Sequence, residues 1–398
     1  CLMGAFLLSL EVWTFWELRQ YAYGAVYQAG SLTLLWAAIL LATTYVVCRK
    51  RLEDWIPLVL SVCTFAILVF LALLVRYRMA DMYLFWNVSF ALRLPMAGAL
   101  AAAAWLIYRA RMNGRLFGGP PFPILKIAAV CGFAAYEVGA LLLTLDVWSF
   151  WEVRQAVYQY NHQYGSLVIL WSVIALATAA VIYAKRLQSW TFLLVAAYAV
   201  GICIFVLSLH RYQVPETYLV LNTTYLARLT LPLSIWAGAH LLRRRDSIAW
   251  SDLTTVAGHV VFAILSAFEL WFWSRRTELV SDKMALSFIS SAWGLQAFSL
   301  IAIGMILRSR TQRLLGLAFF ALTIGKVWLV DLSSVEPLYR ILSFIGVGLL
   351  LLPASVLYQR FSDRLLGESS KKEDGAPTED APAANSGESD HGSGPTAG

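Results

Sequence analysis

Long apolar segments alternate with short polar ones along most of the chain. A helix that crosses a bilayer needs about 20 mainly apolar residues, and these segments are too long and too uniformly apolar for the alternating strands of a membrane β-barrel. The pattern therefore predicts an all-α fold, a polytopic bundle of transmembrane helices. Twelve such segments occur, at residues 1–16, 30–48, 55–75, 84–108, 124–147, 166–184, 190–209, 217–241, 251–273, 284–307, 313–331 and 338–359.

Composition supports a membrane protein and excludes two other classes. Of the 398 residues, 60% are hydrophobic and 14% charged, against about 45–50% and about 25% in soluble domains. The net charge of +7 would indicate nucleic-acid binding only if the basic residues gathered on a wettable surface, and here they lie between apolar segments. Five Cys residues with no CxxC pair give no disulfide framework. The lipid bilayer is thus the expected partner, with no nucleic acid, cofactor or metal.

The two ends of the chain differ in kind. Cys1 is followed at once by apolar residues without a basic region, which is unlike a signal peptide. We interpret the chain as a fragment that begins inside a helix, because a lipidated Cys is normally followed by a polar tether. Residues 367–398 contain Ser, Gly, Pro, Ala and acids, with a charge of 2 − 7 = −5. Such a segment cannot offset its ordering entropy, which predicts a disordered acidic tail.

Lys and Arg residues in the short connections predict the orientation. The even-numbered connections and the end of the last span contain 16 of them, and the odd-numbered connections contain 8. Cytoplasmic loops carry an excess of Lys and Arg. We therefore expect the even-numbered loops and the tail in the cytoplasm, and the odd-numbered loops outside.

An internal repeat connects distant parts of the chain. Residues 11–20 (EVWTFWELRQ) and 146–155 (DVWSFWEVRQ) are identical at seven of ten positions. The same offset of 135 pairs Asn87 with Asn222 and Arg93 with Arg228, and a diverged third copy starts near Ala249. This predicts three tandem transmembrane units of four helices each, at 1–118, 119–246 and 247–366, followed by the tail. Because four is even, the units would share one orientation, unlike inverted transporter repeats.

The last unit contains the most distinctive stretch, GKVWLVDLSSVEPLYRILSFIGVG at residues 325–348, followed by YQRF at 358–361. This stretch resembles the C-terminal signature of a family of bacterial predicted membrane proteins, the domain of unknown function 2339. The resemblance covers the membrane part of the chain and not the tail. It implies a multi-pass protein of the bacterial inner membrane, and it implies no activity.

Acids and tryptophans recur together at the predicted outer ends of two spans. Interfacial Trp is expected as a membrane anchor, so an anchoring and capping role is one interpretation. A binding site for a glycan or lipid headgroup of the cell envelope is a second, because carboxylates bind hydroxyls and Trp stacks on apolar faces. A catalytic carboxylate is a third. The residues are Glu11, Trp13, Trp16 and Glu17, and in the second copy Asp146, Trp148, Trp151 and Glu152.

A few ionisable residues lie within the predicted spans. Arg93, Arg228, Glu137 and His259 are intramembrane, and Lys326 lies towards the end of the eleventh span. An isolated charge at that depth costs at least about 2.5–3.5 kcal/mol, so each should face the bundle interior and have a partner. An arginine paired with Glu137 would hold helices in register, or the same charges would line a path for an anion or proton. We expect His259 to bond a neighbouring helix, since no metal-ligand spacing surrounds it.

These residues lead to one functional hypothesis and two alternatives. The hypothesis is that the protein binds or transports a polar or amphipathic envelope ligand in its outer half, between the aromatic-acid segments and the two buried arginines. The first alternative is a membrane scaffold or assembly protein of the envelope. The second is an enzyme acting on a lipid-linked sugar. Asn87 and Asn222, which match the glycosylation pattern, are interpreted as helix caps or interhelical hydrogen bonds.

Overall fold

The structure is a computed structural model. It describes residues 2–17, 24–74, 77, 83–113, 124–154, 159–185, 190–210, 212–213, 218–244, 248–277 and 282–331, and a few positions between 345 and 356. Most of the predicted twelfth span and the whole predicted acidic tail lie outside these residues.

The described part of the chain is built from helices, which confirms the predicted all-α fold. Nine of the helices in this part are long and apolar enough to cross a membrane. The elements are α1 (Leu2–Glu17), α2 (Gly24–Lys50), η1 (Glu53–Trp55), α3 (Ile56–Leu74), α4 (Val88–Met112), α5 (Ile124–Arg154), α6 (Gln159–Lys185), α7 (Thr191–Leu209), α8 (Thr223–Arg243), α9 (Ile248–Thr277), α10 (Asp282–Ile306), α11 (Arg310–Lys326) and η3 (Val327–Asp331).

Helix bounds differ from the apolar segments where polar residues continue or cap a helix. The fifth helix runs on to Arg154, seven residues beyond the predicted span 124–147, because a helix does not stop where hydrocarbon does. The fourth begins at Val88 rather than at residue 84, because Asn87 caps it with its side chain.

The chain forms two compact units, Cys1–Gln296 and Ala297–Gly398. The boundaries that the sequence predicts at residues 118/119 and 246/247 both lie inside the first unit.

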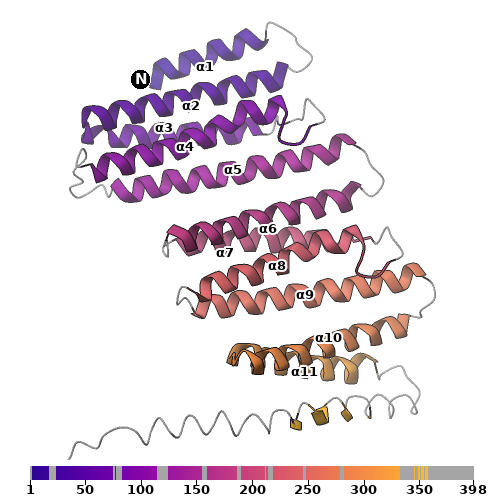
Figure 1. Ribbon diagram of the computed structural model, residues 1–398. Helices are drawn as coiled ribbons and strands as arrows, with labels where there is room; N and C mark the ends of the chain where they lie inside the picture. Colours follow the sequence, from indigo (N-terminus) through magenta and orange to yellow (C-terminus); the bar gives the residue numbers. More distant parts are fainter. Residues whose placement is uncertain are drawn as a thin grey trace, which may run out of the picture. The chain divides into compact units, whose positions relative to one another are not determined.

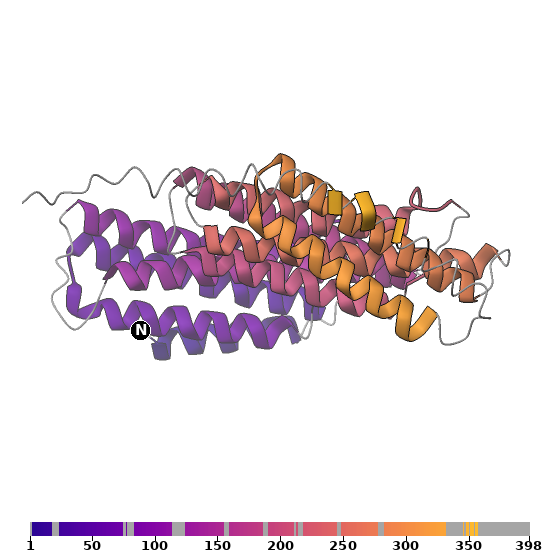
Figure 2. The same cartoon turned by 90° about the horizontal axis from the view of Figure 1, so that it is seen from below.

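The first unit is a row of helices, in which the order of packing is α1, α2, α4, α5, α6, α8 and α9; α2 and α4 run parallel to each other, as do α6 and α8, and the other neighbours in the row are antiparallel. Helix α3 packs on α2 and α7 packs on α6, and both lie on the same side of the row (Figure 1). Seen from below, these helices run lengthwise beside one another (Figure 2). Helices α1 and α5 therefore each precede a group of three helices, and α5 and α9 each follow one.

Helix α5 belongs to the apolar cores on both of its sides. Val138 and Leu142 pack in the core formed with α2, α3 and α4. Ala140 packs in the core formed with α6, α7 and α8, and that core also contains Leu265 of α9. Each of α5 and α9 thus closes the three-helix group that comes before it.

In the second unit, α11 packs closely against the end of α10. Ser309 caps α11 by accepting the Gln312 N–H at 3.4 Å. A Cβ at Gly316 would lie 2.6 Å from the Ile301 side chain, so a larger residue would push the two helices apart.

Candidate functional site

A buried carboxylate joins α5 to the loop before α4. Asp146 is 0% exposed. It accepts hydrogen bonds from the Tyr77 hydroxyl at 2.6 Å, the Phe85 backbone N–H at 2.7 Å and the Asn87 side-chain amide at 2.6 Å. Three donors satisfy a carboxylate that has been removed from solvent, which is the condition for burying it at tolerable cost.

The donors in this cluster are held in place by local structure. Asn87 caps α4 by accepting the Phe90 N–H at 2.9 Å, which confirms the predicted cap. Phe85 has a φ of 58°, a left-handed conformation that is rare outside glycine and that the bond from its N–H to Asp146 helps to hold. Burial, and then the bond to Asp146, raises the pKa of Tyr77, so the hydroxyl keeps the proton that it donates.

The same cluster recurs between α9 and the loop before α8. Glu269 is 1% exposed and accepts from the Tyr212 hydroxyl at 2.6 Å, the Val220 N–H at 3.0 Å and the Asn222 amide. Asn222 caps α8 through the Tyr225 N–H at 2.7 Å, and Val220 has a φ of 69°. Burial, and then the charge of Glu269, raises the pKa of Tyr212.

An arginine lies beneath each of these clusters. Arg93 and Arg228 are both 0% exposed, and their guanidinium carbons lie 5.0 Å and 4.9 Å from the ring centroids of Tyr77 and Tyr212. Each tyrosine therefore contacts a cation through its ring and an anion through its hydroxyl. Each arginine also donates at 3.1 Å to a carbonyl one turn earlier, that of Ser89 or Thr224.

The two arginines differ in their remaining hydrogen bonds. Arg228 donates from Nε to Ser208 Oγ at 2.9 Å and from Nη2 to Asn161 Oδ1 at 3.0 Å. The Nε and Nη2 atoms of Arg93 are buried and have no hydrogen-bond partner among the described residues. The positions 135 residues before Ser208 and Asn161 are Leu73 and Val26, which are apolar and buried. The sequence repeat thus pairs two polar partners of Arg228 with two apolar residues, which was a usable signal that the arginines differ.

The predicted pair of an arginine with Glu137 is not formed. Arg228 donates hydrogen bonds to neutral oxygen atoms, and Arg93 donates one to the Ser89 carbonyl and lies over the Tyr77 ring. Glu137 is half-buried on α5. The pairing failed because each arginine lies next to a tyrosine at the end of the preceding helix, a contact that sequence spacing did not suggest.

The other two intramembrane residues have ordinary surroundings. His259 lies beside Trp236, with ring centroids 4.8 Å apart, and its backbone carbonyl accepts from Gln296 at 3.0 Å. Lys326 is half-buried at the last position of α11.

In the predicted aromatic-acid segments, the tryptophans pack against neighbouring residues and three of the four acids are exposed. Trp16 donates to Ser31 at 3.0 Å and stacks on Tyr27, and Trp151 donates to Ser166 at 3.0 Å and stacks on His162. The carbonyls of Trp13 and Trp148 accept from Gln28 and Gln163. Glu11, Glu17 and Glu152 are exposed. The structure does not bring Glu11 and Asp146 together, because α2 and α4 lie between their helices in the row.

A small polar cavity lies near Arg228. It has a volume of about 200 Å³ and lies between the start of α6 and the start of α8, lined by Asn161, His162, Gly165, Ser166, Ile169, Thr223, Thr224 and Ala227. Asn161 connects it to the guanidinium, since its Oδ1 accepts from Arg228. The cavity thus reaches the partners of the second arginine.

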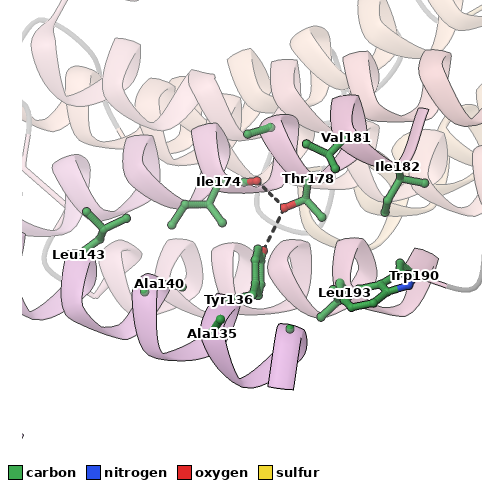
Figure 3. Close-up of a pocket in the computed structure, with 13 residues that line it drawn as sticks. Ala135, Tyr136, Ala140, Leu143, Ile174, Thr178, Val181, Ile182, Trp190 and Leu193 are labelled. Carbon is green, nitrogen blue, oxygen red and sulfur yellow. Dashed lines mark hydrogen bonds between the residues drawn. The ribbon is translucent and has the colours of Figure 1, made fainter. Parts of the chain in front are cut away.

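A larger, apolar groove opens where α5, α6 and α7 meet (Figure 3). Its volume is about 530 Å³, within the range of about 300–1,000 Å³ that is common for ligand sites. The lining residues are Gly132, Ala135, Tyr136, Gly139, Ala140, Leu143, Ile174, Ala177, Thr178, Val181, Ile182, Trp190 and Leu193.

Small residues on α5 create this groove. Gly132, Ala135 and Gly139 recur at three- and four-residue spacing, so they share one face of the helix, and Ala140 follows next to them. A Cβ at Gly139 would meet only Ala97, at 3.9 Å. The sequence reading missed the groove, although this spacing of small residues within a long apolar span was a usable signal.

One hydroxyl pair is the main polar feature among the lining side chains. Thr178 donates to the Ile174 carbonyl at 2.7 Å, so its oxygen accepts from the Tyr136 hydroxyl at 3.1 Å. Both hydroxyls are therefore satisfied within the protein (Figure 3), and the rest of the lining is hydrocarbon. The groove suits an apolar chain and not a hydrated solute.

Comparison with known proteins gives one match. The model of a family described as predicted membrane protein (DUF2339) matches residues 4–361. No curated protein and no solved structure matches the chain significantly.

Proposed function

We propose a function from two facts: the chain belongs to the DUF2339 family of predicted membrane proteins, and its span helices form an apolar groove. The protein binds an amphipathic lipid of the cell envelope by placing the lipid's apolar chain between α5, α6 and α7. The groove is the observation that carries this proposal. It lies within three candidate membrane spans, so hydrocarbon chains are the molecules available to fill it.

The buried polar clusters support this choice, because hydrogen bonds within the chain already occupy their carboxylates. The carboxylates of Asp146 and Glu269 already accept three donors each from the chain. A ligand that bound there would have to displace those donors, two of which belong to helix caps and strained loops. The groove requires no such rearrangement, because its two hydroxyls bond one another and its remaining lining is apolar.

Basic residues at one end of the groove favour an anionic headgroup. Lys126 lies six residues before Gly132 on α5, and Lys185 lies three residues after Ile182 on α6. At about 1.5 Å per residue these distances are about 9 Å and about 4.5 Å. Both side chains are exposed, and both lie at the bundle end where α5 begins and α6 ends. A phosphate headgroup at that end would be attracted by both ammonium groups.

Photolabelling tests the proposal. The purified protein is reconstituted with an anionic phospholipid whose acyl chain carries a diazirine, and the adducts are mapped by mass spectrometry. We expect adducts in residues 132–143 and 174–193 above the level on other lipid-facing helices. Gly139→Leu should lower these adducts several-fold, because the new side chain enters the groove.

A matched glycine provides the control. A Cβ at Gly98 of α4 would meet nothing within 4 Å, so Gly98→Leu adds the same side chain outside the groove and should leave labelling unchanged. The proposal is contradicted if both variants show a thermal unfolding transition, and are therefore folded, but label equally.

A further inference from the structure

A stripe of three residues on α1 is exposed although it has the composition of a buried interface. Met3, Leu7 and Glu11 lie four residues apart, so they share one face of the helix. Met3 is 79% and Leu7 57% exposed, and Glu11 is exposed as well. We call this set the α1 stripe.

The same stripe is buried in α5. Residues 135 positions later are Val138, Leu142 and Asp146, and their exposures are 4%, 0% and 0%. The two apolar residues pack in the core of α2, α3 and α4, and the acid accepts the Tyr77, Phe85 and Asn87 donors.

Helix α9 repeats the arrangement. Val261, Leu265 and Glu269 have the same spacing, with exposures of 4%, 0% and 1%. The apolar pair packs in the core of α6, α7 and α8, and the acid accepts the Tyr212, Val220 and Asn222 donors. In both helices the stripe is therefore covered by the three-helix group that comes before it.

The opposite face of α1 is packed as it is in α5. Ser9 accepts a hydrogen bond from the Trp36 indole at 3.1 Å, and Thr144 accepts one from Trp171 at 3.1 Å. Ala5 and Ala140 are both buried nearby. Helix α1 thus packs on the group that follows it as α5 does, and none of the described residues covers the α1 stripe on its other side.

We propose that the α1 stripe is the docking surface for a further helical group of this same repeat. The partner presents a loop with a Tyr ten residues before an Asn and an Arg six residues after it, as Tyr77, Asn87 and Arg93 do. The partner's Tyr hydroxyl, loop backbone N–H and Asn amide donate to Glu11, and the helix that contains its Arg covers Leu7 and Met3. The two loops of this kind within the first compact unit already bond Asp146 and Glu269. A second α1 is a poor partner because the two carboxylates would repel.

Site-specific cross-linking in the membranes of cells that make the protein tests this inference, which does not depend on lipid binding in the groove. Leu7 is replaced by benzoylphenylalanine, the sample is irradiated, and the adducted peptide is sequenced by mass spectrometry. We expect a peptide from a helical segment with the Tyr-Asn-Arg spacing. Glu11→Leu should lower the adduct yield several-fold, because the carboxylate no longer accepts the partner's donors.

The second acid of α1 supplies the control, since Glu17 is also exposed but lies off the stripe. Glu17→Leu should leave the yield unchanged. Adducts to lipid alone, to α1 of a second copy, or to a polypeptide without that spacing would overturn the inference, as would equal yields in the two acid variants.

Discussion

The polar clusters at Asp146 and Glu269 and the apolar groove between α5 and α7 are opposite solutions to burial in a membrane. In the clusters, each carboxylate is buried and accepts three hydrogen bonds from a neighbouring loop. In the groove, small residues leave about 530 Å³ without protein atoms. Buried charge in this membrane protein therefore holds helices together, whereas small residues provide the space for a ligand.

The largest expected effect is the loss of a cluster carboxylate. Asp146→Ala leaves the buried Tyr77 and Asn87 donors without their acceptor, and removing one partner of a buried charged network costs about 3–5 kcal/mol. The free energy of unfolding in detergent measures it. Glu11→Ala, at the matching position of the exposed α1 stripe, should leave the isolated protein's stability unchanged. Equal effects would show that the clusters do not hold the helices together.

The tyrosine hydroxyls are expected to come next. Tyr212→Phe keeps the ring beneath which Arg228 lies but removes a donor to Glu269, and a hydrogen bond to a charged group contributes about 1.5–3 kcal/mol. Tyr77→Phe should cost a similar amount, because the bond to Asp146 has the same length. Unfolding measurements of both variants check this, and a negligible loss in either would mean that its carboxylate finds another donor.

The two arginines should differ by a smaller amount. Arg228→Met removes the donors to Asn161 Oδ1 and Ser208 Oγ, whereas Arg93→Met removes two buried nitrogen atoms that have no partner among the described residues. Since an unsatisfied buried group costs about 1–3 kcal/mol, Arg228→Met should destabilise more than Arg93→Met by about that amount. The comparison is made on unfolding free energies at one pH and in one detergent. The reverse order would contradict the assignment of unequal partners.

The smallest effect on stability is expected in the groove. Gly139→Leu fills open space and exchanges a flexible residue for a good helix former, which is worth up to about 1 kcal/mol in a helix interior. Its thermal midpoint should therefore be equal to or above that of the unmodified protein when no groove lipid is added. A large loss would show that the groove is closed by packing in the membrane.

The helical fold was predictable because span length and hydropathy are local properties. Asn87 and Asn222 were predicted as caps for the same reason, since a cap depends on residues within one turn. The partners of Arg93 and Arg228 were not predictable in this way. They depend on Tyr77 and Tyr212, which precede the arginines by sixteen residues and approach them only when the loop folds back under a carboxylate from another helix. The groove was not predicted because it arises where Gly139 and Ala135 have no large side chain to fill the space between the helices.

The central claim, that the groove holds an apolar chain, is tested most directly by an electron cryomicroscopy map of the protein in a bilayer of anionic phospholipid. The account predicts a continuous chain-shaped density against Gly139 and Ala177, with its headgroup near Lys126 and Lys185, and its loss in Gly139→Leu. A groove filled by the protein's own side chains, or a density that persists unchanged in that variant, would contradict it.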